Sequence, residues 1–214
     1  MFDTVTGTLG IIMTAVSISF YLYVEKRANR RAKAVLKPFA SLGFLILALS
    51  SGALQSGWGI VLLIGLTFCT AGDLFLLSRN RGPFSAGLAS FLTGHLCYCA
   101  AIVMRGPAPV PVAVAAAALI LPALFIWRWL RPHLAGGMRG PVAAYVVVIS
   151  AMLALAIGAP GTGVSWRLIP GALAFYLSDI AVARDRFVAP GFGNRVWGLP
   201  LYYFGQLLIA SCAG

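Results

Sequence analysis

The sequence predicts an all-α integral membrane protein, a bundle of eight transmembrane helices that forms a single domain over residues 1–214. Two bulk properties support this prediction: 60% of the residues are hydrophobic and only 10% are charged, and the mean hydropathy is +0.92. A water-soluble fold of 214 residues cannot hide so much apolar surface from water. A third observation, the spacing of the apolar runs, sets the number of helices.

Eight apolar segments are long enough to cross about 30 Å of hydrocarbon at roughly 1.5 Å per residue. We expect spans at 5–24, 38–54, 58–78, 85–104, 110–127, 141–159, 168–183 and 196–213. The connecting segments are short and rich in Gly, Pro and Arg, so they leave no room for a second domain.

The basic residues indicate the orientation of these spans. Of the 16 Lys and Arg residues, all but Arg105 and Arg167 fall in the first, third, fifth and seventh loops. Because Lys and Arg are retained on the cytoplasmic side, both termini are expected on the non-cytoplasmic side of the cell (inner) membrane. The net charge of +11 is therefore interpreted as a topology signal, and no nucleic-acid partner is expected.

Two acidic residues, Asp73 and Asp179, fall inside the third and seventh spans, each about 7 to 8 Å from the expected cytoplasmic end. Ser178 precedes the second of them. A carboxylate in hydrocarbon costs several kcal/mol, so these side chains are expected to face the interior of the bundle and to be functional. The alternative is that they pair with Arg79 and Arg184 at the membrane interface.

Polar residues in the fourth and eighth spans fall on single helix faces. In "GLASFLTGHLCY", His95 and Tyr98 are three residues apart and point the same way. In "LYYFGQ", Tyr202 and Tyr203 precede Gln206 by four and three residues and share its side. Both helices are therefore expected to direct a polar cluster inward, although a lone His on an apolar helix is more often a packing residue.

The sequence pattern of spans three and four recurs in spans seven and eight. "GDLFLLSRNR" followed by "TGHL" is similar to "SDIAVARDR" followed by "FGQL". A separation of four spans gives both pairs the same orientation, which favours a parallel 4 + 4 internal repeat with a site between the halves.

The four cysteines, Cys69, Cys97, Cys99 and Cys212, all lie within expected spans. Their spacing matches neither a zinc motif nor a redox pair, so they are interpreted as small packing residues.

Several motifs together resemble a known family. In order along the chain, "KP" at Lys37–Pro38, "GDLFLL" at 72–77, "GLASFLTGHLCY" at 87–98, "GALAFYLSD" at 171–179 and "YYFGQLLI" at 202–209 are similar to motifs of the YhhN-like lysoplasmalogenases. The resemblance implies an eight-span hydrolase that cleaves the vinyl ether bond of a lysoplasmalogen-like lysophospholipid, giving a fatty aldehyde and a glycerophospho-headgroup. No metal and no other cofactor is expected.

The family motifs can be placed on this chain residue by residue. Asp73 and Asp179 match the two acidic motifs and His95 matches the GH motif, which implies catalytic roles for all three. The inward-facing residues Tyr98, Ser178, Tyr202, Tyr203 and Gln206 are predicted to bind substrate. Lys37, which matches the KP motif at the membrane surface, is expected to hold the lipid phosphate at the cytoplasmic rim together with Arg79 and Arg184.

The chemistry agrees with a pair of carboxyl groups. Vinyl ether hydrolysis needs a proton delivered to carbon, followed by attack of water on an oxocarbenium ion. Burial and a second nearby carboxylate both favour the protonated form, so one Asp can act as the acid while the other accepts a proton from water. Glycoside hydrolysis by two carboxylates passes through a similar ion. The sequence does not distinguish the two roles.

Three other interpretations remain open at this stage. A metal-assisted hydrolase would use Asp73, Asp179 and His95 as three ligands. A proton-coupled transporter also needs intramembrane acids, but the outer halves of the spans hold almost no ionisable group. A scaffold packed through small residues, as in "SGALQSGWG", would leave both acids without a role.

Overall fold

The computed structural model describes residues 4–27, 29–78 and 80–214, and this part of the chain is helical with no β-strand. The helices are α1 (Thr4–Lys26), α2 (Arg30–Ser50), α3 (Gly57–Phe75), α4 (Arg81–Met104), α5 (Pro109–Leu130), α6 (Gly136–Gly158), α7 (Leu168–Ala183) and α8 (Phe192–Ala210). Three short 3₁₀ turns lie between them, and a π-helical segment, Arg184–Val188, continues α7. All eight expected helices are therefore present.

The largest departure from the sequence prediction is the start of α2. This helix begins at Arg30, because the side chain of Asn29 accepts a hydrogen bond from the backbone N–H of Ala32 at 3.1 Å and caps it. Pro38, where the span was expected to start, lies inside the helix. Lys37 is consequently about two turns inside α2 and buried, not at its end.

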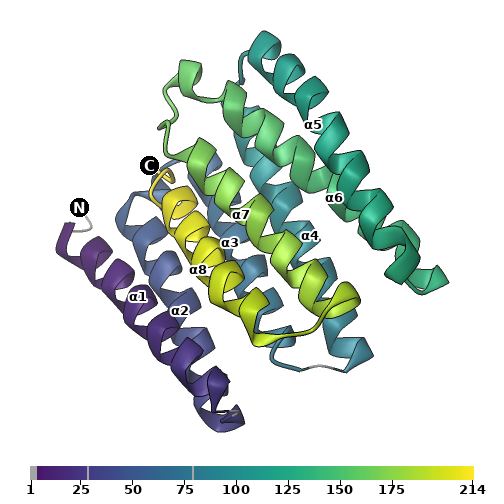
Figure 1. The fold of residues 1–214 in the computed structure, drawn as a ribbon. Coiled ribbons are helices and arrows are strands. Elements are labelled where there is room, and N and C mark those ends of the chain that lie inside the picture. Colours follow the sequence, from purple (N-terminus) through teal and green to yellow (C-terminus); the bar gives the residue numbers. More distant parts are fainter. Residues whose placement is uncertain (1–3, 28, 79) are drawn as a thin grey trace.

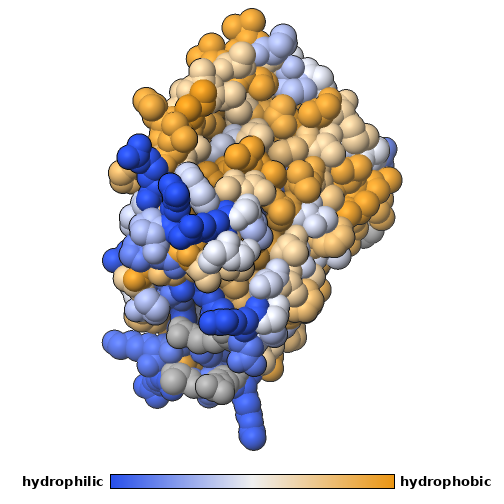
Figure 2. Space-filling model, turned by 90° about the vertical axis from the view of Figure 1, so that its right-hand side faces the viewer, coloured by the Kyte–Doolittle hydropathy of each residue, from blue (hydrophilic) through white to orange (hydrophobic). Residues whose placement is uncertain are grey.

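The surface is suited to hydrocarbon. Helices α1 to α6 are each long and apolar enough to cross a membrane. Helix α7 has 16 residues before its π-helical continuation, and α8 has 19 with Pro200 inside it. The large side chains of α5 point outward, with Leu121 76% and Phe125 72% exposed. Figure 2 shows hydrophobic residues over most of the visible face, with hydrophilic residues gathered toward one end and one edge.

Four antiparallel hairpins make up the bundle: α1 with α2, α3 with α4, α5 with α6, and α7 with α8. In Figure 1 the second and fourth hairpins lie at the centre, flanked on one edge by α1 and α2 and on the other by α5 and α6. Helix α2 packs against α3 and α8, and α6 packs against α7 and α4. If four is added to each helix number, with α1 following α8, the contacts of α2 become those of α6, and the contacts of α6 become those of α2.

Close helix approach within the central hairpins depends on glycine. A Cβ atom on Gly205 of α8 would lie 2.8 Å from the carbonyl oxygen of Gly171 in α7. In the other central hairpin, a Cβ on Gly65 or Gly94 would lie 3.1 Å from the carbonyl oxygen of the other residue. Small residues let helix backbones pack at short range where no water drives association.

Candidate active site

A cavity of about 290 Å³ opens within the bundle, lined by residues from all eight helices. The lining residues come from the C-terminal ends of the odd-numbered helices and the N-terminal ends of the even-numbered ones, so the cavity lies at the end that carries the basic loops. Both Asp73 and Asp179 line it. The two intramembrane acids expected from the sequence therefore share one cavity.

Asp73 lies in the last turn of α3 and is 2% exposed. Its Oδ1 is 3.2 Å from the Nζ of Lys37, and its Oδ2 accepts hydrogen bonds from Ser41 Oγ at 2.7 Å and Tyr202 OH at 2.8 Å. Lys37 and Ser41 are one turn apart on α2, so one helix face delivers both groups. These contacts suit a carboxylate, because an ionised carboxyl group only accepts hydrogen bonds.

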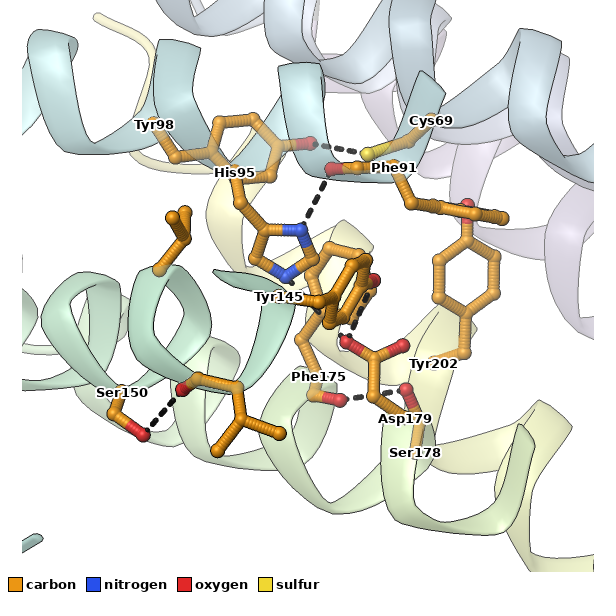
Figure 3. Close-up of polar contacts among 12 residues, drawn as sticks. Cys69, Phe91, His95, Tyr98, Tyr145, Ser150, Phe175, Ser178, Asp179 and Tyr202 are labelled. Carbon is orange, nitrogen blue, oxygen red and sulfur yellow. Dashed lines mark hydrogen bonds and ion pairs between the residues drawn. The ribbon is translucent and has the colours of Figure 1, made fainter. Parts of the chain in front are cut away.

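Asp179 has a different set of partners, shown in Figure 3. Its Oδ2 accepts a hydrogen bond from Tyr145 OH at 3.0 Å, and the Nε2 of His95 lies 3.5 Å from the same oxygen. The Nδ1 of His95 lies 2.7 Å from the carbonyl oxygen of Phe91. Because a carbonyl can only accept, Nδ1 carries the proton and Nε2 faces Asp179. Within the described residues Nε2 makes no hydrogen bond of good geometry.

A chain of side-chain hydrogen bonds leads away from Asp73 into the core. Tyr202 OH accepts from Gln206 Nε2 at 3.3 Å, and Gln206 Oε1 accepts from Tyr98 OH at 2.9 Å. Tyr203 OH lies 3.3 Å from Ser41 Oγ. Tyr98, Tyr203 and Gln206 are buried behind the cavity lining, where a satisfied polar network fixes the position of neighbouring groups.

One aromatic ring, that of Phe175, contacts a neighbour of each of the two acids. The ring of Phe175 lies 4.3 Å from that of His95 and 5.3 Å from that of Tyr202, measured between centroids. His95 belongs to the surroundings of Asp179, and Tyr202 belongs to those of Asp73. A displacement of the Phe175 ring would therefore change the surroundings of both Asp73 and Asp179.

The cavity has a charged mouth, which we define as Glu25, Lys33, Asp185 and Arg195. Glu25 pairs with Lys33 at 3.0 Å and with Arg195, and Arg195 also contacts Asp185 at 3.1 Å. The mouth thereby ties α1 and α2 to the start of α8 and to the π-helical segment that follows α7. The deeper wall on the side of α4, α5 and α6 is apolar, with Leu88, Ile126 and Val146 among its residues.

The predicted site residues fall into three groups. The cavity lining includes Lys37, Asp73, Ser178, Asp179 and Tyr202, whereas His95, Tyr98, Tyr203 and Gln206 lie behind it. Arg184 donates a hydrogen bond to Asn194 and is not part of the lining, and Arg79 lies outside the described residues.

Two of the predicted binding residues have unexpected partners. Lys37 is paired with Asp73, and the hydroxyl of Ser178 donates to the carbonyl of Phe175 in its own helix at 2.7 Å. Both side chains are therefore held by groups of the protein itself.

The sequence did not predict Ser41, which donates a hydrogen bond to Asp73, or Tyr145, which donates one to Asp179. Ser41 lies one turn after Lys37, and Tyr145 is the sole tyrosine of the sixth expected span, so weak signals existed for both. The mouth residues were missed because Glu25 and Arg195 were assigned to the flanks of spans.

No group of three His, Cys, Asp or Glu side chains in the described part of the chain is arranged to hold a metal ion. The set of Asp73, Asp179 and His95 considered for a metal-assisted mechanism is divided, because the first bonds Lys37 and Ser41 while the other two contact each other.

Fold and site together define an all-helical integral membrane protein with a largely apolar cavity, lined in its interior by Asp73 and Asp179 and bordered by a charged mouth. The chain belongs to the YhhN family, whose sequence profile matches residues 32–213. The resemblance expected from the motifs is thereby confirmed.

Several named relatives are similar to this chain. It is 30% identical over 208 residues to lysoplasmalogenase TMEM86A of Bos taurus, which covers 93% of this chain and 85% of the relative. It is 34% identical over 159 residues to lysoplasmalogenase TMEM86B of Homo sapiens, with 74% and 66% covered. A lysoplasmalogenase of Mycobacterium tuberculosis (strain CDC 1551 / Oshkosh) is 31% identical over 126 residues, 56% of this chain and 46% of the relative. No solved structure matches the chain.

Proposed function

We propose that this protein is a hydrolase that cleaves the vinyl ether bond of a lysoplasmalogen-like lysophospholipid. The observation that carries the proposal is that Asp73 and Asp179, from two different hairpins, line one cavity inside an apolar bundle. The names of the relatives supply the substrate class. The products are a fatty aldehyde and a glycerophospho-headgroup.

The reaction uses the two carboxyl groups as acid and base. One carboxyl transfers its proton to the vinyl carbon remote from the ether oxygen, and the π electrons form the new C–H bond. Water attacks the resulting oxocarbenium carbon and gives its proton to the other carboxylate. The hemiacetal then loses its hydroxyl proton as the bond from carbon to the glycerol oxygen breaks, and that oxygen takes up a proton.

The two ends of the cavity suit the two ends of such a lipid. The apolar wall formed by α4, α5 and α6 accepts the alkenyl chain, while the charged mouth lies where a headgroup would leave the membrane. Lys33 and Arg195 line the cavity there, whereas Arg184 does not. Lys33 and Arg195 are both paired with Glu25, so a phosphate would take the place of that carboxylate. Lys37 is paired with Asp73 deeper in the cavity, and Arg184 donates to Asn194.

The proposal includes an eight-span topology with both termini on the non-cytoplasmic side and the cavity in the cytoplasmic leaflet of the cell membrane. The location of both termini at the end opposite the basic loops supports it.

An internal 4 + 4 repeat is part of the same proposal and is supported by the contacts of the acids. Asp73 of α3 bonds Ser41 of α2 and Tyr202 of α8, while Asp179 of α7 contacts Tyr145 of α6 and His95 of α4. Adding four to each helix label converts the first set into the second.

The test is aldehyde release from lysoplasmalogen in detergent micelles by the purified protein, compared with Asp73→Asn, Asp179→Asn and a chelator-treated sample. Loss of release with either variant, together with indifference to chelator, is expected. Chelator sensitivity that added metal reverses would contradict the carboxylate mechanism. Absence of release from well-folded wild-type protein would remove the substrate assignment, and proton-coupled uptake in liposomes would then be measured.

A further inference from the structure

We infer that Asp179, and not Asp73, delivers the proton to the vinyl carbon, and that Tyr145 is its positioning residue. This inference rests on the proposed function and assigns the roles that the sequence left open.

Asp73 is unsuited to donate because its oxygens are occupied by donors. The Lys37 ammonium lies against Oδ1, and the hydroxyls of Ser41 and Tyr202 donate to Oδ2. A proton added to this carboxyl would face three groups that themselves present protons. Asp73 therefore serves as the carboxylate that accepts the proton of the attacking water.

Asp179 faces an acceptor as well as a donor. Tyr145 donates to Oδ2, but the Nε2 of His95, 3.5 Å from the same oxygen, is an acceptor in the neutral imidazole whose Nδ1–H is bonded to Phe91. Two buried acceptors at this distance are stable together when one of them carries a proton. The Asp179–His95 pair thus holds a proton that the Asp73 cluster does not.

The route of that proton follows from exposure. The His95 side chain is 1% exposed and does not line the cavity, whereas the Asp179 side chain is 16% exposed and does. Among the described residues, both the hydrogen bond from Tyr145 and the contact with His95 involve Oδ2 of Asp179, so the edge of the carboxyl that carries Oδ1 is left for the substrate. Tyr145 and His95 fix that orientation from α6 and α4.

The transfer is balanced as follows. The Asp179 carboxyl loses its proton to the vinyl carbon and becomes a carboxylate, while the former C=C electron pair becomes the C–H bond. The water proton passes to Asp73, and exchange through water in the shared cavity restores the proton of Asp179 between turnovers.

The first experiment compares Tyr145→Phe with Tyr23→Phe. Both variants lose one phenol hydroxyl, but Tyr23 is 56% exposed on α1 and does not line the cavity. We expect Tyr145→Phe to lower kcat by about tenfold or more with KM within about twofold, since general acid catalysis contributes roughly 10²- to 10⁴-fold. Tyr23→Phe should leave both constants within about twofold of wild type. An unchanged kcat, or a change confined to KM, in Tyr145→Phe would overturn the positioning role.

The second experiment uses chemical rescue with acetic acid, and the folding of each variant is verified by size-exclusion chromatography and thermal denaturation. Aldehyde release by Asp179→Ala should rise with the concentration of undissociated acetic acid. Release by Asp73→Ala should instead rise with the concentration of acetate anion. The reverse pattern would overturn the assignment. If wild-type protein releases no aldehyde, the proposed function fails first; if wild type is active and only the rescue pattern is reversed, the proposed function stands and this inference fails.

Discussion

Lys37 Nζ lies 3.2 Å from Asp73 Oδ1, and the two side chains are only 6% and 3% exposed. Removing one partner of a buried ion pair leaves an uncompensated charge, which costs about 3–5 kcal/mol. We therefore expect Lys37→Met to lower the thermal stability of the detergent-solubilised protein markedly. Adding Asp73→Asn should restore most of the loss, measured as Tm in a double-mutant cycle. Equal Tm values for Lys37→Met and wild type would contradict a structural pair.

The glycine contact between α7 and α8 predicts a second stability effect. Gly205→Val places branched atoms where even a Cβ would lie 2.8 Å from the Gly171 carbonyl oxygen, so the helices must separate. Overpacking of this kind costs about 1–3 kcal/mol. Gly137→Ala is the control, because no atom lies within 4 Å of the added Cβ. Thermal unfolding should show a lower Tm for the first variant and an unchanged or higher Tm for the second.

The charged mouth predicts an effect on substrate affinity. Arg195→Gln should raise KM for lysoplasmalogen about three- to tenfold with a smaller change in kcat, because a partly exposed cation contributes about 1 kcal/mol to anion binding. Arg167 precedes α7 at its N-terminal end, whereas the cavity lies at the C-terminal end of that helix, so Arg167→Gln serves as the control. Steady-state kinetics would contradict this role if both variants gave the same KM.

The proposed topology predicts where reagents from outside the cell can reach. In a variant without native cysteines, Gly161→Cys in the connection from α6 to α7 should react with a membrane-impermeant maleimide on intact cells. Ala135→Cys, between α5 and α6, should react only after permeabilisation. The opposite labelling pattern would show that the bundle has the reverse orientation in the membrane.

Hydropathy was sufficient to predict the helices and to identify both acids, because apolar runs and the cost of intramembrane charge are local properties of the chain. It did not predict which helix face meets which. The pairing of Ser41 with Asp73, and of Tyr145 with Asp179, depends on contacts across helices that no periodicity specifies.

One error had a simple physical cause. Lys37 was expected at the membrane surface because Pro38 was interpreted as the start of a span. The Asn29 cap instead begins the helix two turns earlier, and the pyrrolidine ring is accommodated within it. A lysine expected to meet a lipid phosphate is consequently a partner of Asp73.

The hydrogen bond from Tyr202 to Asp73 joins groups 129 residues apart, and α8 also packs against α1, α2 and α3. During biosynthesis α8 leaves the ribosome after seven other helices have emerged. The Asp73 carboxylate therefore lacks one of its hydroxyl partners until α8 has been made. A nonsense codon between Asp73 and Tyr202 would leave that carboxylate without the Tyr202 hydroxyl.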